Sequence, residues 1–518
     1  MKKVFCTILT ALLVLVGCDD QRQQVTATLE DKNITENSEH LVVVTPWEIT
    51  SADPSKSGYI FQRLQLAETL VDVEDDGRLV GGLATDWQHN DDASVWVFNL
   101  RPEVKFHDNT PLTADDVVNS LQVALTKPTA LKSAFIEEIK ALNPLQVQIT
   151  LKQGLVSFPA YLAHSTTIIL AKSSFDQQQN VHQIIGTGPY QVVKIEPPQK
   201  IEQIAFKSYW GEPAKIERVD YLANSRSETR TLLAQSKPNY LVFNLDAASV
   251  NRLQQDPNLS VQTKSIARTI QYKVNVAHPL FADVQVRQAL SDAIDRQGIA
   301  QSVLRIKEGV ADQIFPPAFA DWRLDVAYQQ PDYRQIQQRL LDLGFQLNEQ
   351  GVLEKEGKPV KFTLRTFSDR PELPLVATAL QNQWKQLGID VDVSIGNFSE
   401  IPAGHQDGSL EMALFARNYG MIPDPMATLL TDFAPEGGDW GVMNWQNSSL
   451  TQALQQLQTT FDPSQQRELK QQIAQIIYTE RPITPVVFYQ QNVASHKNLK
   501  GLELDPFERS FNLNKLSW

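Results

Sequence analysis

Segments with the pattern of a strand and segments with the pattern of a helix alternate along nearly the whole chain, and this alternation limits the fold more than any other feature. Leu41–Val44 is a short β-branched run typical of a buried strand, and Val360–Phe367 also has a strand pattern. In 283–294 and 372–387, by contrast, apolar residues recur on one helical face. Because strands and helices alternate throughout, the sequence predicts an α/β fold.

Turn and capping residues mark where these elements begin and end. Asp75-Asp76-Gly77 and Gly186–Tyr190 are turn sequences, and Thr113 with Asp116 has the spacing of a helix capping box. The other expected strands are 95–100, 146–152, 268–276, 389–393 and 486–488, and the other expected helices are 59–70, 113–125, 331–344, 449–459 and 464–479. No internal repeat of the kind found in solenoids is present in the sequence.

The composition is that of a globular protein. Of the 518 residues, 42% are hydrophobic and 21% are charged, which suits two or three domains with large cores. The formal net charge of -13 argues against binding to nucleic acid and against electrostatic docking on anionic lipid. By the same reasoning, an acidic chain is expected to favour cationic or neutral ligands.

Residues 1–18 have the features of a bacterial lipoprotein signal peptide. Lys2 and Lys3 precede an apolar stretch that is shorter than the ~20 residues needed to span a bilayer. The run that ends at Cys18, Leu-Val-Gly-Cys, resembles a lipobox, so we expect Cys18 to carry a lipid. The alternative is a plain secretory signal with a chance cysteine. In enterobacterial-type lipoproteins, an aspartate at the place of Asp19 implies retention at the inner membrane.

The residues that follow the lipobox predict a tether and a domain without disulfides. Residues 19–39 are polar and have few large apolar side chains, which is typical of a flexible segment. The only other cysteine, Cys6, lies within the expected signal peptide. The folded domain is therefore expected to form without a disulfide.

Residues 415–425 combine a guanidinium, an aromatic ring and a carboxylate where an expected strand enters a loop. Arg417, Tyr419 and Asp424 supply these groups, and the alternating segment 410–414 precedes them. Loops at the ends of buried strands often present ligand contacts. We therefore predict that this stretch forms one wall of a ligand cleft; the alternative is an ordinary strand and loop with a surface salt bridge.

Several ordered motifs resemble the bacterial extracellular solute-binding proteins of family 5, over nearly all of residues 40–510. The most specific piece is 96–118, which is similar to the family's "ytFxLRxgvkFhdGxpltAeDVv" pattern. Residues 186–190 match "GTGPY", 209–211 match "YWg", and 283–296 resemble "d.rVRqAl..aidr".

The resemblance implies a two-lobed periplasmic-binding-protein fold of type II, with an extra N-terminal subdomain and a central cleft. Lobe I is expected to comprise 40–272 together with 489–518, and lobe II is expected to comprise 276–485. The implied function is capture of a peptide or nickel-chelate solute in the cleft, on the periplasmic side of the membrane, for delivery to an ABC permease and ATPase complex. We expect a monomer, with no cofactor and no catalysis.

Within the family, the stretch around 417–426 is closer to the nickel-chelate branch than to the peptide binders. Peptide binders pair the ligand's ammonium with an aspartate before the "DP" dipeptide, and this place is occupied by Met421. The nickel-chelate branch reads roughly "RxWGxxYDPH", from which this chain departs at Tyr419, Pro423 and Met426. The same resemblance places Lys132 and Ser165 at the positions of two carboxylate-binding arginines.

Three aromatic residues and one histidine complete the expected ligand contacts. Trp47, Tyr59 and Trp440 are candidates to stack on a ligand, and His164 is a candidate to face the cleft. For each of them a structural role is the alternative. The expected contacts also imply that Tyr419→Ala and Arg417→Ala weaken binding without unfolding the protein.

Two other classes of function compete with solute capture. An enzyme is disfavoured because the chain has no G-x-S-x-G elbow, no H-E-x-x-H motif and no P-loop, and because Cys6 and Cys18 fall in the expected signal and lipidation site. A periplasmic ligand sensor or chaperone-like protein with the same fold stays open. Neighbouring permease and ATPase genes would favour import over sensing.

Overall fold

The computed structural model describes residues 40–368, 370, 372–433 and 438–518. The expected signal peptide 1–18, the expected tether 19–39, and with them Cys18 and Asp19, lie outside these residues. Among the helices of the described ranges, none combines the length and the apolar character needed to cross a membrane.

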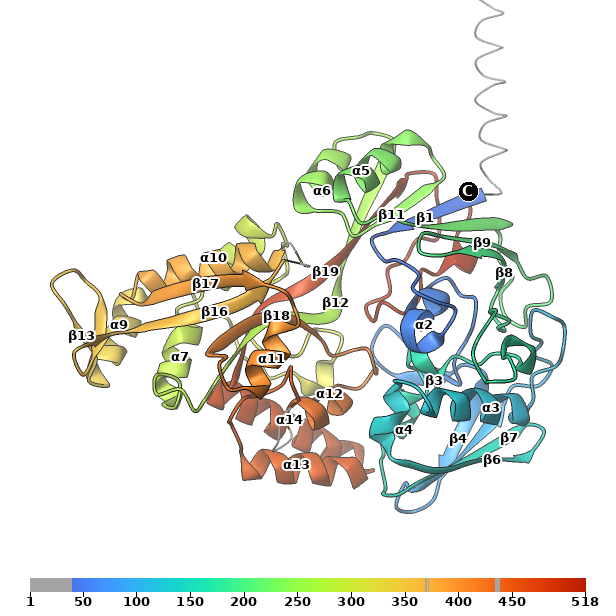
Figure 1. The fold of residues 1–518 in the computed structure, drawn as a ribbon, viewed down its shortest axis with the longest axis horizontal. Helices are drawn as coiled ribbons and strands as arrows, with labels where there is room; N and C mark the ends of the chain where they lie inside the picture. Colours follow the sequence, from blue (N-terminus) through green and yellow to red (C-terminus); the bar gives the residue numbers. More distant parts are fainter. Residues whose placement is uncertain (1–39, 369, 371, 434–437) are drawn as a thin grey trace, which may run out of the picture.

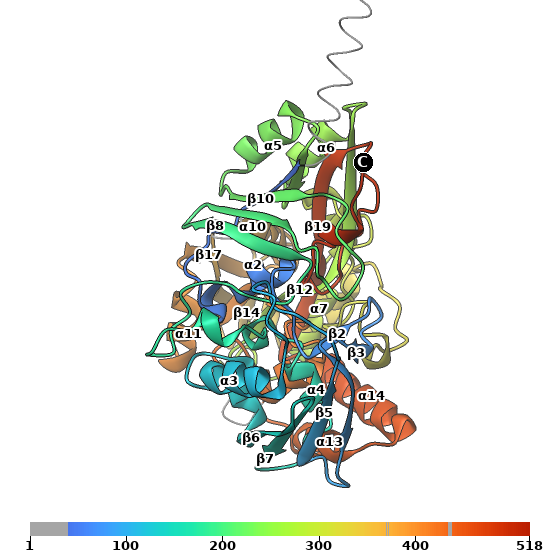
Figure 2. The ribbon, with the colours of Figure 1, turned by 90° about the vertical axis from the view of Figure 1, so that its right-hand side faces the viewer.

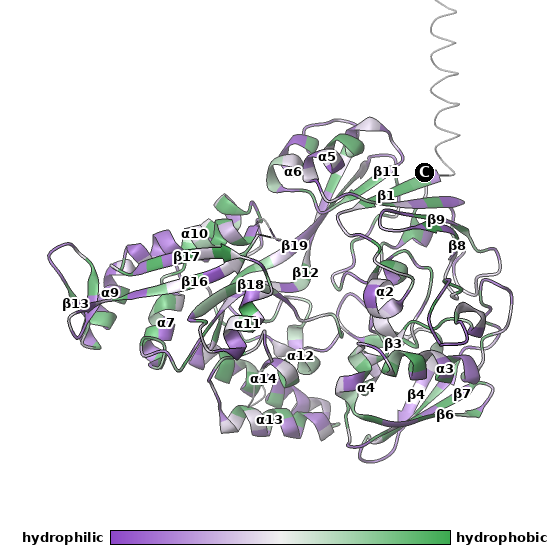
Figure 3. Ribbon diagram, viewed as in Figure 1, coloured by the Kyte–Doolittle hydropathy of each residue, from purple (hydrophilic) through white to green (hydrophobic). Residues whose placement is uncertain are grey.

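One mixed sheet of ten strands runs through the whole molecule, which confirms the predicted α/β fold (Figure 1). Its strands lie in the order β17 (Asp390–Gly396), β16 (Lys361–Phe367), β18 (Met412–Asn418), β12 (Leu259–Val274), β19 (Ile483–His496), β11 (Tyr240–Phe243), β1 (His40–Thr45), β10 (Arg218–Ala223), β9 (Lys200–Ala205) and β8 (Tyr190–Glu196). Strands β1 and β11 are almost entirely hydrophobic, as Figure 3 shows, because the sheet is buried there.

Strands β12 and β19 join the two halves of this sheet. The first part of β12 pairs with β19 up to the Ser265–Gln490 pair, and the ladder resumes at Thr269–Phe488. Residues 266–268 therefore bulge out opposite Tyr489 alone. Within the bulge, the Ala267 amide donates to the Pro506 carbonyl at 2.8 Å, so the C-terminal segment supports the crossing point.

Each half of the sheet contains parallel strands whose carboxyl ends face the space between the halves. β16 is parallel to β17 and β18, and β1 is parallel to β10 and β11. Helix α10 (Glu372–Lys385) follows β16, while α5 (Ser227–Ser236) and α6 (Ala247–Leu253) follow β10 and β11. Ligands of open α/β sheets bind outside the carboxyl ends of such strands.

A separate four-stranded antiparallel sheet, formed by residues 84–151, makes an additional layer. Its strands lie in the order β4 (Ala84–His89), β5 (Val95–Leu100), β7 (Gln146–Leu151) and β6 (Ile136–Asn143), and helix α3 (Ala114–Leu125) packs on it. The predicted capping box begins α3, where the Asp116 carboxylate accepts from the Thr113 amide at 3.0 Å.

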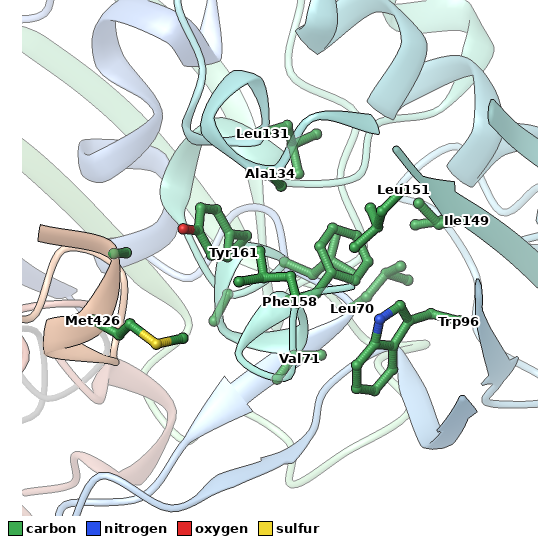
Figure 4. Packing of buried hydrophobic residues seen from close by; sticks show 14 of the residues in the cluster. Leu70, Val71, Trp96, Leu131, Ala134, Ile149, Leu151, Phe158, Tyr161 and Met426 are labelled. Carbon is green, nitrogen blue, oxygen red and sulfur yellow. The ribbon is translucent and has the colours of Figure 1, made fainter. Parts of the chain in front are cut away.

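This additional sheet packs against the helices that follow β18. Helices α12 (Pro425–Asp432), α13 (Ser448–Thr459) and α14 (Pro463–Glu480) share one hydrophobic core with it, and Figure 2 shows α13 and α14 beside β5. In Figure 4, Met426 of α12 lies beside Tyr161 of α4 (Phe158–Tyr161). The Val156 amide also donates to the Gln458 carbonyl at 2.8 Å.

The remaining elements connect these layers. The other helices are α2 (Pro54–Arg63), α7 (Val284–Asp292), α8 (Arg296–Gly298), α9 (Tyr333–Asp342) and α11 (Glu400–Gln406), and the other strands are β2 (Val71–Val73), β3 (Leu79–Gly81), β13 (Gln346–Leu347), β14 (Leu353–Lys355) and β15 (Lys358–Pro359). A second core packs α7 and α10 on β12, β16 and β18, and a third packs α2 on β1 and β10.

The predicted helix 372–387 corresponds to α10, but the two joining strands are longer than the sequence pattern indicates. β12 begins nine residues before the predicted start at 268, and β19 extends well beyond the predicted 486–488. The second half of β19 contains Gln490, Gln491 and Asn492, whose polar side chains hide the strand pattern. Helix α2 spans Pro54–Arg63, whereas the expected helix was 59–70.

Candidate ligand cavity

A cavity of about 1940 Å³ lies between the carboxyl ends of the parallel strands in the two halves. Trp47 lies just after β1, and Asn244 lies just after β11. From the other half, Arg370 follows β16 and Phe398 follows β17. The cavity exceeds the ~300–1,000 Å³ typical of a pocket for a drug-sized ligand, so it has room for a solute of that size or larger.

The cavity is cationic although the chain as a whole is acidic. Seven cationic side chains line it against four anionic side chains. The cations are Arg230, Lys264, Arg268, Arg305, Lys307, Arg370 and Arg417, and the anions are Asp75, Asp246, Glu308 and Glu372. The expectation that the chain favours cationic or neutral ligands, drawn from its net charge, stays a prediction; the excess of cationic over anionic side chains in this lining favours anions instead.

Two arginines meet one tyrosine at the cavity wall, where the bulge in β12 carries Arg268 and Arg370 follows β16. The Arg268 and Arg370 guanidinium carbons lie 5.4 and 5.7 Å from the centroid of the Tyr489 ring. The Tyr489 hydroxyl donates to Glu372 at 2.6 Å, and Arg268 forms an ion pair with Glu508 at 3.0 Å. Burial lowers the pKa of Arg268, and the neighbouring Arg370 charge lowers it further.

Arg417 lies on β18, next to the β12 segment that carries Arg268, and forms a two-point ion pair. Its Nε and Nη2 atoms donate to the two Asp432 carboxylate oxygens, each at 2.7 Å. The Asp432 side chain is 1% exposed, and its burial raises its pKa although Arg417 opposes that shift. This pair therefore fixes the Arg417 side chain at the edge of the cavity.

A buried lysine on β12 holds the loop that carries Trp440. Lys273 has no exposed surface, and its ammonium donates to the Asp439 carbonyl at 2.6 Å and to His405 Nδ1 at 2.7 Å. Because burial dominates, the pKa of Lys273 is lowered to about 7. The Gln406 amide donates to the Asp439 carboxylate at 3.0 Å and fixes the loop from a second side.

The structure brings three of the nine predicted ligand residues to the cavity. Trp47, Arg417 and Trp440 line it. The Trp47 ring lies 4.4 Å from the Arg63 guanidinium carbon, and its carbonyl accepts from the Tyr221 hydroxyl at 2.6 Å.

Tyr419 and Asp424, two other predicted ligand residues, make structural contacts outside the cavity lining. The Tyr419 side chain is 0% exposed, its hydroxyl donates to Gln271 at 2.9 Å, and its ring packs on Phe315. The Asp424 carboxylate accepts from the Met426 amide at 2.9 Å and so begins helix α12. Neither side chain lines the cavity.

The other four predicted residues also lie outside the cavity lining. Tyr59 packs in α2 with its ring centroid 5.4 Å from the Arg63 guanidinium carbon. Lys132 is exposed on a 3-10 turn. His164 accepts from the Thr166 amide at 3.1 Å, and burial lowers its pKa to about 4, while the Ser165 backbone lies against α2.

The sequence reasoning missed Arg268, Arg370, Phe398 and Tyr489. Arg370 and Phe398 come directly after strands β16 and β17, and a residue just past the carboxyl end of a parallel strand is a candidate ligand contact. Because Arg370 and Phe398 each follow an expected strand, the sequence could have identified both as candidate ligand contacts. Arg268 and Tyr489 depend on the bulge, for which the sequence pattern carries no signal.

Within the ranges that the structure describes, no three His, Cys, Asp or Glu side chains gather closely enough to hold a metal ion.

Comparisons with known proteins agree with this fold. Residues 78–440 match the bacterial extracellular solute-binding proteins, family 5 Middle. The nickel-binding periplasmic protein of Escherichia coli is 25% identical over 89% of this chain and 93% of its own length. A dipeptide-binding protein of Pseudomonas aeruginosa is 25% identical over 86% of this chain and 88% of its own length.

Solved structures are similar over nearly the full chain. A nickel ABC transporter protein from Bacillus halodurans has a TM-score of 0.81 and 24% sequence identity, over 93% of this chain and 100% of that protein. The shared fold is the two-lobed fold of these binding proteins.

Proposed function

Because this chain belongs to the bacterial extracellular solute-binding proteins of family 5, we propose that its cavity captures a small solute for delivery to an ABC importer. The observation that carries this proposal is the position of the cavity. It lies between the carboxyl ends of parallel strands from both halves, and within the described part of the chain only β12 and β19 join the two halves of the sheet. A solute that touches both walls would favour the closed arrangement of the two halves over an open one.

The lobes, in this proposal, are the two segments predicted from the sequence, 40–272 with 489–518 and 276–485. The register change between Ser265 and Thr269, opposite Tyr489, supports a crossing in this region. A bulge interrupts the ladder and allows the paired strands to bend there. The protein would then act as a monomer without catalysis, and a permease and an ATPase would take the solute onward.

The proposed solute belongs to the peptide or metal-chelate class. Relatives are named for nickel binding and for dipeptide binding. Two features support an anionic member of this class. The cavity lining has more cationic than anionic side chains, and Met421, at the place where peptide binders have an aspartate, cannot pair with an ammonium.

We expect solutes of this class to raise the melting temperature of the purified protein, because a ligand that binds only the native state stabilises it. The measurement is a thermal-shift assay with dipeptides and nickel–histidine complexes, alongside native mass spectrometry of the freshly purified protein. A bound mass or a concentration-dependent shift would support the proposal. A protein with no bound mass and no shift across both sets would count against solute capture.

We also propose that the protein is anchored by a lipid on Cys18, on the periplasmic side of the inner membrane. The Leu-Val-Gly-Cys run and the following Asp19 support this placement. Cys18→Ser is expected to move the protein from the membrane fraction to the soluble fraction, because a single lipid-modified cysteine is the only expected anchor. The measurement is immunoblotting of separated fractions, with Cys6→Ser as the matched control. Retention of the Cys18→Ser protein in membranes would contradict the anchor.

A further inference from the structure

In the half of the cavity formed by β16, β17 and β18, part of the wall consists of aromatic side chains, which form no ion pairs. Phe398 and Trp440 present it, and Phe367 and Phe415 lie behind them. The Phe367 ring lies 6.5 Å from Phe398 and 6.2 Å from Trp440, and the Phe415 ring lies 5.5 Å from Trp440. Phe367 and Phe415 are nearly fully buried, so they act as a support for the two rings that reach the cavity.

The two outer rings are available to a ligand. Phe398 is 50% exposed, which is high for a phenylalanine inside a cavity lining, and Leu375 beside the same cavity is 54% exposed. Trp440 is half-buried, and its loop is fixed by the contacts of Lys273 and Gln406 to Asp439. Exposed apolar area of this kind gains free energy when an apolar surface covers it.

A cation that has no carboxylate partner among the described residues lies close to this wall. Arg370 follows Phe367 by three residues, and among the described residues it forms no ion pair; its recorded contacts are with the Tyr489 ring and hydroxyl. Arg268, whose guanidinium carbon lies 5.4 Å from the centroid of the same ring, is already paired with Glu508. The two neighbouring positive charges repel each other, and an anion bound to Arg370 would relieve that repulsion.

We propose that the cavity selects solutes that combine an aromatic body with a carboxylate or similar anionic group. The aromatic part stacks on Phe398 and Trp440, and the anionic group meets Arg370 beside Arg268. This inference rests on the proposed function and narrows it, because neither the family nor its general solute class requires an aromatic part. Aromatic rings prefer such stacked or edge-on contacts, and a guanidinium binds a carboxylate through two parallel hydrogen bonds.

The test is calorimetric titration of the purified protein with three matched probes. They are 2-naphthaleneacetate, its uncharged amide, and the saturated analogue decahydronaphthaleneacetate. The carboxylate with the aromatic body is expected to bind at least about tenfold more tightly than either of the others, since each lacks one of the two contacts. Arg370→Gln and Phe398→Ala are each expected to weaken its binding by about tenfold.

Two control variants separate recognition from general damage. Phe398→Tyr keeps the ring and is expected to retain the affinity for 2-naphthaleneacetate. Arg467→Gln removes an arginine that is 70% exposed and outside the cavity lining, and no change is expected. Equal affinity for all three probes, or unchanged affinity in both Arg370→Gln and Phe398→Ala, would overturn the inference. A wild-type protein that binds dipeptides or nickel–histidine complexes but none of the three probes would overturn it too, while the proposed function would stand.

Discussion

Tyr419→Ala is expected to lower the free energy of unfolding by about 3–5 kcal/mol, because it empties a fully buried aromatic site. The Tyr419 ring packs on Phe315, and its hydroxyl is the hydrogen-bond donor to Gln271. Gln271 is itself buried, so the substitution also leaves its carbonyl oxygen without that donor. The measurement is urea unfolding of the purified protein without ligand.

Tyr419→Phe is the matched control, since it keeps the ring and removes only the hydroxyl. Its expected cost is about 1 kcal/mol. These two results together would indicate that Tyr419 stabilises the fold. They would replace the sequence-based expectation that Tyr419→Ala weakens binding without unfolding the protein. A Tyr419→Ala protein as stable as the wild type but deficient in solute binding would restore Tyr419 as a ligand contact.

Arg417→Ala is expected to cost about 3–5 kcal/mol of stability, because it leaves the buried Asp432 carboxylate without its partner. Such a loss is a large part of the ~5–15 kcal/mol by which native proteins are stable. The double variant Arg417→Met with Asp432→Asn removes both charges, so it is expected to be clearly more stable than Arg417→Ala alone. Chemical denaturation of the single and double variants measures the difference.

The pH dependence of this loss provides a second readout. Burial already raises the pKa of Asp432, and removing Arg417 raises it further. When the pKa of a carboxyl group is higher in the folded state than in the unfolded state, the protein becomes more stable as the pH falls. The stability difference between Arg417→Ala and the wild type is therefore expected to shrink at lower pH. A difference that is constant with pH, together with a double variant no more stable than the single, would contradict the role given to Asp432.

The fold could be predicted from the sequence where the local pattern was strong. Helix α10 was predicted within two residues of its end, because its apolar face has the helical spacing and a turn glycine follows. β19 was largely missed because Gln491 and Asn492 are polar yet lie in the sheet. The Asn492 side chain, for example, bonds both to the Leu245 amide and to the Leu245 carbonyl, at 2.7 and 2.8 Å. Polar residues satisfied in this way are not visible in a hydrophobic pattern.

The ligand site was harder to predict than the fold. The stretch 415–425 does supply Arg417 to the cavity, but the pattern did not indicate that Tyr419 turns into the core. The net charge of the chain also carried no information on the charge of the cavity lining, because Arg268, Arg370 and Arg417 come from three separate segments that only the folded sheet brings together. Which side a loop residue faces, and which distant charges meet, depend on the topology.

The position of β19 has a consequence for how the protein is made. This strand lies between β12 and β11, so it joins the two half-sheets, yet it comes from residues 483–496 of a 518-residue chain. A nascent chain therefore cannot pair the facing edges of β12 and β11 until residues 483–496 have been synthesised. Until then each of these two strands presents unpaired backbone groups at a sheet edge, and such an edge can pair with another chain.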